Sequence, residues 1–115
     1  MSRVWMYGQD SGYMSRQSLV GFTVEAADGG IGHVDRQQDQ PGMQHLVVDT
    51  GVWKFGRSVL IPAGAVTAID TQAQTVKVAP SREEIKAAPR FTTDSETADR
   101  DYLSEVGDYY LSLRF

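Results

Sequence analysis

The sequence predicts an all-β fold, a small and strongly bent, mostly antiparallel barrel of about six strands, followed by short C-terminal helices. Apolar residues recur mainly at every second position from Leu19 to Ala79, which is typical of strands with one buried face. Turn-forming residues interrupt this alternation at short intervals, as in small sandwiches and barrels. We therefore divide the chain into an N-terminal arm (1–18), a barrel (19–80) and a C-terminal helical extension with an aromatic strap (81–115).

The first two strands form a predicted hairpin. The first is expected at 20–26, where Val20 begins a series of alternate apolar residues that face the core. Asp28-Gly29-Gly30 then supplies residues that adopt positive φ at little cost, as a tight turn requires. The second strand is expected at 31–37. Because its apolar residues change parity, we also expect a β-bulge near Gly32.

Four more strands complete the predicted sheet, at 45–49, 58–61, 66–69 and 75–79. The third strand of the chain is apolar on both faces at its centre, which indicates that it is covered on both sides. Pro62 has no backbone N–H to donate to a ladder, so we expect the chain to bend there.

Two helix starts follow the strands. Ser81-Arg82-Glu83-Glu84 has the pattern of a capping box, and the helix it begins is expected to end by Ala88. The same pattern recurs at 93–96, before apolar residues at helical spacing. Gly107 is expected to end this second helix, which leaves residues 108–111 as an aromatic tail.

Three stretches carry a family resemblance, LVGFTVEAADGGIGHV, HLVVDTGVWKFGRSVLIPAGAVTAID and VKVAPSREEIKAAPRF, in this order. In sequence and spacing they resemble the PRC-barrel family, named for the cytoplasmic domain of the photosynthetic reaction centre's H subunit and shared with the ribosome maturation factor. The resemblance implies a strongly bent barrel that acts as an adaptor module, with no shared catalytic motif. Eighteen residues before Leu19 are too few for a second barrel domain, so short stand-alone bacterial members, sometimes linked with stress responses, are the closer match.

Charge is distributed unevenly along the chain. Residues 91–115 carry six acidic and two basic residues, whereas residues 1–90 carry nine of each. No basic stripe is available to release counterions from phosphates, which disfavours nucleic acid and anionic membranes as partners. The absence of cysteine removes disulfides and thiolate chemistry, and no apolar run is long enough for a signal peptide or a membrane span. We therefore expect a cytoplasmic protein that does not insert into membranes.

One tripeptide raises an enzymatic alternative. Asp49-Thr50-Gly51 is the signature of aspartic proteases, and a chain of this length could dimerise to bring two carboxylates around one shared proton. The alternative function is therefore a small homodimeric hydrolase built on Asp49. Val52 and Trp53 follow, where the protease pattern favours a small residue. The structural interpretation is that Asp49 ends a strand and that its carboxylate accepts hydrogen bonds from the turn amides.

Metal and cofactor sites are not predicted. His33 and His45 lie near Asp35 and Asp49 at alternate strand positions, but the spacing matches no established metal site. Gly29-Gly30-Ile31-Gly32 lies in a predicted hairpin and lacks the strand, turn and helix of a dinucleotide loop. We expect neither a metal nor a cofactor.

The aromatic residues are the candidate interaction site. Trp53 and Phe55 lie between Gly51 and Gly56, which are expected to turn the chain sharply. Their rings either pack over the mouth of the barrel or against the C-terminal helix, or they remain exposed as an anchor for a partner.

The ends of the chain are also rich in rings. Tyr109 and Tyr110 lie in a C-terminal segment that is too apolar for a disordered acidic tail. The N-terminal set that includes Trp5 has no period, so a docked arm and a disordered one are both consistent with it. We predict a non-enzymatic adaptor that forms a homodimer, with Trp53, Phe55, Tyr109 and Tyr110 in or near the contact.

Overall fold

The computed structural model describes residues 3–14, 17–51, 58–89 and 99–113, and these are the described residues below. Their strands form one sheet in the order β4-β3-β2-β1-β6-β5, and only the β1–β6 pair is parallel. The all-β class and the mostly antiparallel pairing are confirmed. The strands are β1 (Thr23–Ala26), β2 (Gly29–Gln38), β3 (His45–Asp49), β4 (Ser58–Pro62), β5 (Val66–Asp70) and β6 (Thr75–Val78).

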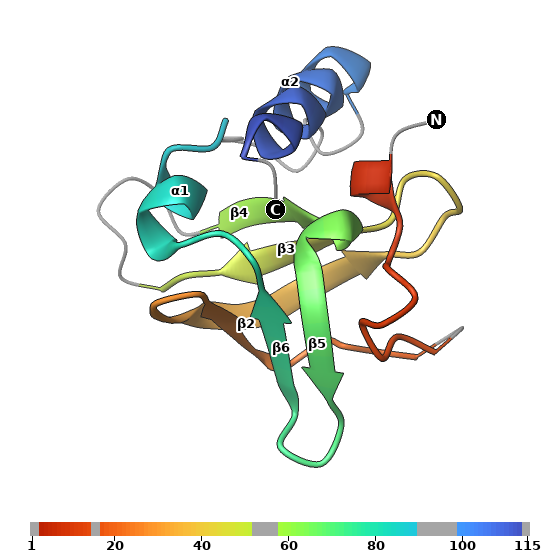
Figure 1. The fold of residues 1–115 in the computed structure, drawn as a ribbon, viewed down its shortest axis with the longest axis vertical. Coiled ribbons are helices and arrows are strands. Elements are labelled where there is room, and N and C mark those ends of the chain that lie inside the picture. The colour runs from red at the N-terminus through yellow and green to blue at the C-terminus, as the bar shows by residue number, and fades with distance from the viewer. Residues whose placement is uncertain (1–2, 15–16, 52–57, 90–98, 114–115) are drawn as a thin grey trace.

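The six strands do not close into the barrel that the sequence predicts. β4 and β5 lie at opposite ends of the strand order and share no ladder, so the sheet stays open. Between them the chain enters a single 3-10 turn, η2 (Ala63–Ala65), directly after Pro62. Pro62 has no N–H for a ladder, and the amide of Ala63 donates to Gln44 at 3.0 Å. The predicted bend is therefore present, and it redirects the chain before β4 and β5 can pair (Figure 1).

The predicted strands agree with the observed ones to within a few residues, except at the first. β1 begins at Thr23, and Val20 is 53% exposed, so its predicted place in the core is wrong. Gly21 has φ of +89°, and the amide of Phe22 donates to the carbonyl of Leu19 at 3.0 Å. This tight turn breaks the alternation, and Leu19, rather than Val20, is fully buried.

The bulge predicted near Gly32 is confirmed. Val24 pairs with Gly32 and Glu25 pairs with Gly30, so Ile31 is the extra residue of β2. Gly32 has φ of +151°, and a Cβ at this position would collide with the backbone carbonyl of Asp49. Glycine is therefore required here both by the backbone conformation and by the close approach of β3.

The first helix follows its sequence signal. α1 (Arg82–Lys86) begins with the predicted capping box, in which the amide of Glu84 donates to Ser81 Oγ at 3.2 Å and the amide of Ser81 donates to Glu84 Oε1 at 2.9 Å. Ile85 is its fully buried residue. This side chain joins the apolar core that the sheet forms with the helices.

The second helix is longer than predicted. α2 (Arg100–Ser112) begins at Asp99, whose carboxylate accepts from the amides of the first turn, and continues through Gly107. Gly107 therefore does not end the helix, and residues 108–111 are helical rather than a tail. The predicted capping box at 93–96 lies outside the described residues. Figure 1 shows α2 lying over β4.

The described residues of the N-terminal arm, 3–14 and 17–18, pack against the rest of the chain. Its 3-10 turn, η1 (Arg3–Trp5), places Val4 in the main core at 3% exposure. The amide of Gln44 donates to the carbonyl of Trp5 at 3.0 Å, and Tyr13 Oη donates to Asp39 Oδ2 at 2.6 Å. Domain boundaries at residues 18 and 80 stay a prediction.

Replacing Gly32 by alanine is expected to lower the free energy of unfolding by about 2 kcal/mol or more, because the new methyl group collides with a neighbouring strand and φ is unfavourable. Gly30→Ala is the matched control, since its Cβ would meet nothing within 4 Å. Urea titration of both variants checks this. Equal stability of the two variants would contradict the close approach of β2 and β3.

Candidate functional site

One surface pocket, with a volume of about 360 Å³, lies where the end of β3 meets the middle of β2. Asp49 lines it, and its Oδ1 accepts a hydrogen bond from the amide of Gly51 at 2.8 Å. Gly51 has φ of +69°. The structural interpretation of Asp49 as a turn residue and the sharp turn at Gly51 are confirmed, whereas Gly56 lies outside the described residues.

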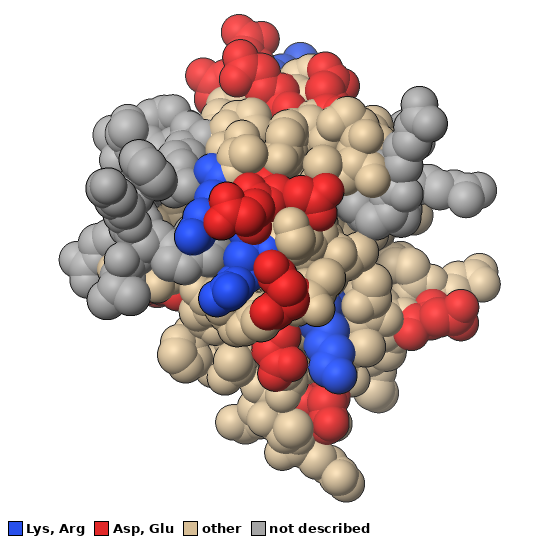
Figure 2. Space-filling view, turned by 60° about the vertical axis from the view of Figure 1, so that its left-hand side comes forward, with Lys and Arg blue, Asp and Glu red and all other residues tan. Residues whose placement is uncertain are grey.

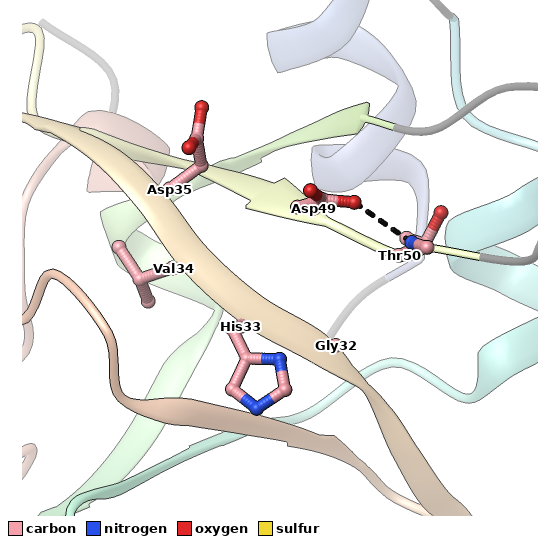
Figure 3. A pocket seen from close by; sticks show the side chains of 7 residues that line it. Gly32, His33, Val34, Asp35, Asp49 and Thr50 are labelled. Carbon is pink, nitrogen blue, oxygen red and sulfur yellow. Dashed lines mark hydrogen bonds between the residues drawn. The ribbon is translucent and has the colours of Figure 1, made fainter.

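The acids and the histidine of this hollow do not converge. Figure 3 shows the carboxylates of Asp35 and Asp49 on one side of the β2–β3 pair and the imidazole of His33 pointing away from them. The register of β2 shifts between Val34 and Arg36, which alters the alternation of faces along the strand. Within the described parts of the chain, no three His, Asp or Glu side chains lie close enough to hold a metal ion.

His45 lies in a different part of the molecule and is buried, with 4% of its surface exposed. Its Nδ1 lies 2.9 Å from the carbonyl oxygen of Met43, which requires Nδ1 to carry the proton. The rings of His45 and Trp5 meet edge to face, with centroids 5.8 Å apart. Burial lowers the pKa of His45, the hydrogen bond to Met43 partly opposes this shift, and the nearby charge of Arg36 adds to it.

A second, more apolar pocket of about 290 Å³ opens beside His45, between η1, the β2–β3 loop and α2. Trp5, Met43 and Leu103 supply apolar walls from these three elements. Arg100 and Ser104, which are exposed on the first turns of α2, complete the lining. A surface pocket with aromatic and thioether walls suits an apolar group more than a reacting one.

The predicted aromatic site is only partly visible. Trp53 and Phe55 lie outside the described residues. Tyr110 is fully buried within its own chain, while Tyr109 is half-buried and its Oη donates to the carbonyl of Glu84 at 2.6 Å. Burial raises the pKa of Tyr109. The interaction role of these four residues stays a prediction.

The exposed side of α2 carries a row of acids. Asp101, Glu105 and Asp108 recur at helical spacing, and all three are exposed. Figure 2 shows acidic side chains gathered over the upper part of the molecule, where α2 lies. No ion pair found among the described residues involves these three carboxylates. This acidic row lies on the same helix as one wall of the apolar pocket.

Sequence reasoning did not identify the apolar pocket. Trp5 belongs to an N-terminal segment without a period, and Met43 carries no sequence signal of a pocket wall. Leu103 is one of the apolar residues at helical spacing in the predicted second helix, and this spacing does not separate a core position from a pocket wall. The pocket depends on contacts between distant segments, and no local signal could have located it.

Comparisons with known proteins leave the family unassigned. No protein-family model matches the sequence, and no curated protein matches it. Among solved structures, the chain is similar to RimM, a Pseudomonas aeruginosa protein assigned to 16S ribosomal RNA processing, with 22% sequence identity and a TM-score of 0.47. The match covers 56% of this chain and 42% of that chain, so it spans less than half of RimM.

Of the helices in the described ranges, none has the length and apolar character needed to cross a bilayer.

Stability is expected to depend on pH through His45. Its pKa is lower in the folded chain than the ordinary value of 6.5, so the unfolded chain binds the proton more tightly. The neutral ring makes its full contribution to the free energy of unfolding above about pH 6.5. This contribution is lost progressively as the pH falls from there toward the lowered pKa of the folded chain.

Urea titrations between pH 7.5 and about pH 4.5 measure this dependence. His45→Asn should reduce it, because the amide nitrogen replaces Nδ1 without titrating, and His33→Gln at an exposed site is the control. The same pH dependence in wild type and His45→Asn would contradict the burial of this ring.

Proposed function

We propose that this chain is a non-enzymatic protein-interaction module of the PRC-barrel type. The observation that carries the proposal is the apolar surface pocket formed by Trp5, Met43 and Leu103 beside a well-packed core. The family type rests on the three sequence stretches that resemble PRC barrels, and the mostly antiparallel six-stranded sheet is compatible with it. Cytoplasmic location is part of the proposal and is supported by the lack of cysteine.

Asp49, the basis of the enzymatic alternative, and His45, considered above as a metal ligand, both make contacts within the fold. Asp49 Oδ1 accepts the hydrogen bond that shapes its own turn, and His45 is buried against Met43 and Trp5. A hydrolase built on Asp49 would need a second carboxylate facing it across a dimer axis. The hydrogen bond from Gly51 shows Asp49 Oδ1 taking part in its own turn, and this contact is consistent with the proposed binding function.

The pocket has the character of an anchor site. Apolar side chains that insert into well-packed pockets carry much of the energy of protein interfaces, and methionine walls adapt to the shape of the group that enters. Ser104 lines the pocket from an exposed helix position, so a larger side chain there can obstruct the opening without entering the core.

Photo-crosslinking tests the proposed interaction. A benzophenone amino acid placed at Ser104 is expected to form a discrete protein adduct in cells that express the chain, whereas the same group at Ser112 serves as a matched control. Both positions are exposed on α2, but only Ser104 lines the pocket. Adducts that form equally at both positions, or none at Ser104, would contradict the proposal, and cleavage of peptides by the purified chain would favour the hydrolase.

We also propose that the chain forms a homodimer, with Trp53 and Phe55 in the contact and Tyr109 near it. Met6, Met14, Val20 and Leu111 are exposed apolar side chains that a partner subunit would cover. Trp53→Ala should weaken dimerisation by about 2 kcal/mol or more if this ring is a central anchor. Sedimentation over a concentration series measures this, and a strict monomer at high concentration would overturn it.

A further inference from the structure

We propose that the pocket binds one large apolar side chain of a basic segment in a partner protein, and that the acidic row of α2 binds the lysines or arginines beside it. This proposal rests on the proposed function and specifies its partner. It combines two features of α2. One is the pocket wall, to which the helix contributes Leu103 and Ser104. The other is the acidic row of Asp101, Glu105 and Asp108.

The apolar part of the partner follows from the walls of the pocket. Trp5 offers an aromatic ring, Met43 a flexible thioether and Leu103 a branched aliphatic group. The His45 ring lines the same pocket, and burial lowers its pKa, which favours the neutral ring. A volume of about 290 Å³ accommodates one side chain of the size of leucine or phenylalanine.

The charged part of the partner follows from the geometry of α2. Asp101, Glu105 and Asp108 are spaced by four and three residues and therefore form one row along the helix. Ser104 lies between the pocket and this row, because each residue advances about 100° around the helix. In an extended segment, residues two apart lie about 7 Å from each other, so one short segment can reach both features.

The local charge favours a protein over a nucleic acid. The acidic row repels phosphates, whereas ammonium and guanidinium groups gain charge-assisted hydrogen bonds with its carboxylates. Arg100 lies at the pocket rim and contributes a long aliphatic stem to its lining. A basic segment would place its charges away from Arg100 and over the row.

Synthetic peptides of known sequence test this inference with the full chain. The probes are acetyl-KKGFGKK-amide, the same peptide with serine in place of phenylalanine, and the same peptide with glutamate in place of every lysine. Titration is followed by the indole N–H resonance of Trp5 in a Trp53→Phe background. We expect the basic phenylalanine peptide to bind at least about tenfold more tightly than either of the others.

Two pairs of variants identify the surface used. Ser104→Trp should weaken binding at least about tenfold, while Ser112→Trp on the same helix should leave it unchanged. Neutralising Asp101, Glu105 and Asp108 together should weaken binding of the basic phenylalanine peptide and reduce the dependence of this binding on salt concentration. A matched triple neutralisation elsewhere, at the exposed acids Asp10, Asp35 and Glu83, should have little effect.

The outcomes separate this inference from the proposed function. Equal binding of the phenylalanine and serine peptides, tighter binding of the glutamate peptide, or indifference to Ser104→Trp would overturn the inference. Binding of a poly-uridine RNA in place of the peptides would overturn it as well. A protein adduct at Ser104 in cells together with any of these results would leave the interaction module intact and show that its partner has a different chemistry.

Discussion

The contact of the Trp5 ring with two distant segments holds the molecule in its observed form. The ring meets His45 edge to face, and its Nε1 lies so close to Gly107 that a Cβ there would be 3.1 Å away. The backbone of Trp5 is fixed at the same time by the hydrogen bond from Gln44. One residue thus connects the N-terminal arm, the start of β3 and the middle of α2.

The pocket is a consequence of this contact rather than of the sheet. Its walls come from the arm, the loop before β3 and α2, and these elements meet around Trp5. A glycine in a helix interior costs about 1 kcal/mol relative to alanine, and here it allows the indole to approach the helix closely. Tyr109 adds a second tie through the carbonyl of Glu84, so α2 is also attached to α1.

Local signals predicted the parts of the fold that local chemistry determines. Asp49 and Gly51 form their turn through a hydrogen bond two residues apart, and the capping box of Ser81 is equally local. Sequence reasoning failed where contacts between distant segments determine the local structure. Gly107 has the local character of a helix end, and only the approach of Trp5 explains its place inside a helix.

The same distinction applies to the sheet and to the candidate site. Alternation located the strands because each needs one buried face, but it contains no information on whether β4 and β5 pair. Val20 fits the alternating pattern, although the turn at Gly21 removes it from the strand. The acidic character of the C-terminal segment was visible from composition, whereas the pocket beside the acids was not.

Hydrogen exchange on a Trp5→Ala variant tests most directly whether this ring holds α2 and the pocket in place. Trp53→Ala is the matched control for loss of a tryptophan. In Trp5→Ala we expect the amides of Leu103 to Tyr110 to lose at least about tenfold of their protection against exchange, while the amides of β2 and β3 keep theirs. The helix can detach from the sheet without unfolding of the sheet, so the two regions exchange through different opening events. Unchanged protection of α2 in Trp5→Ala would contradict the account.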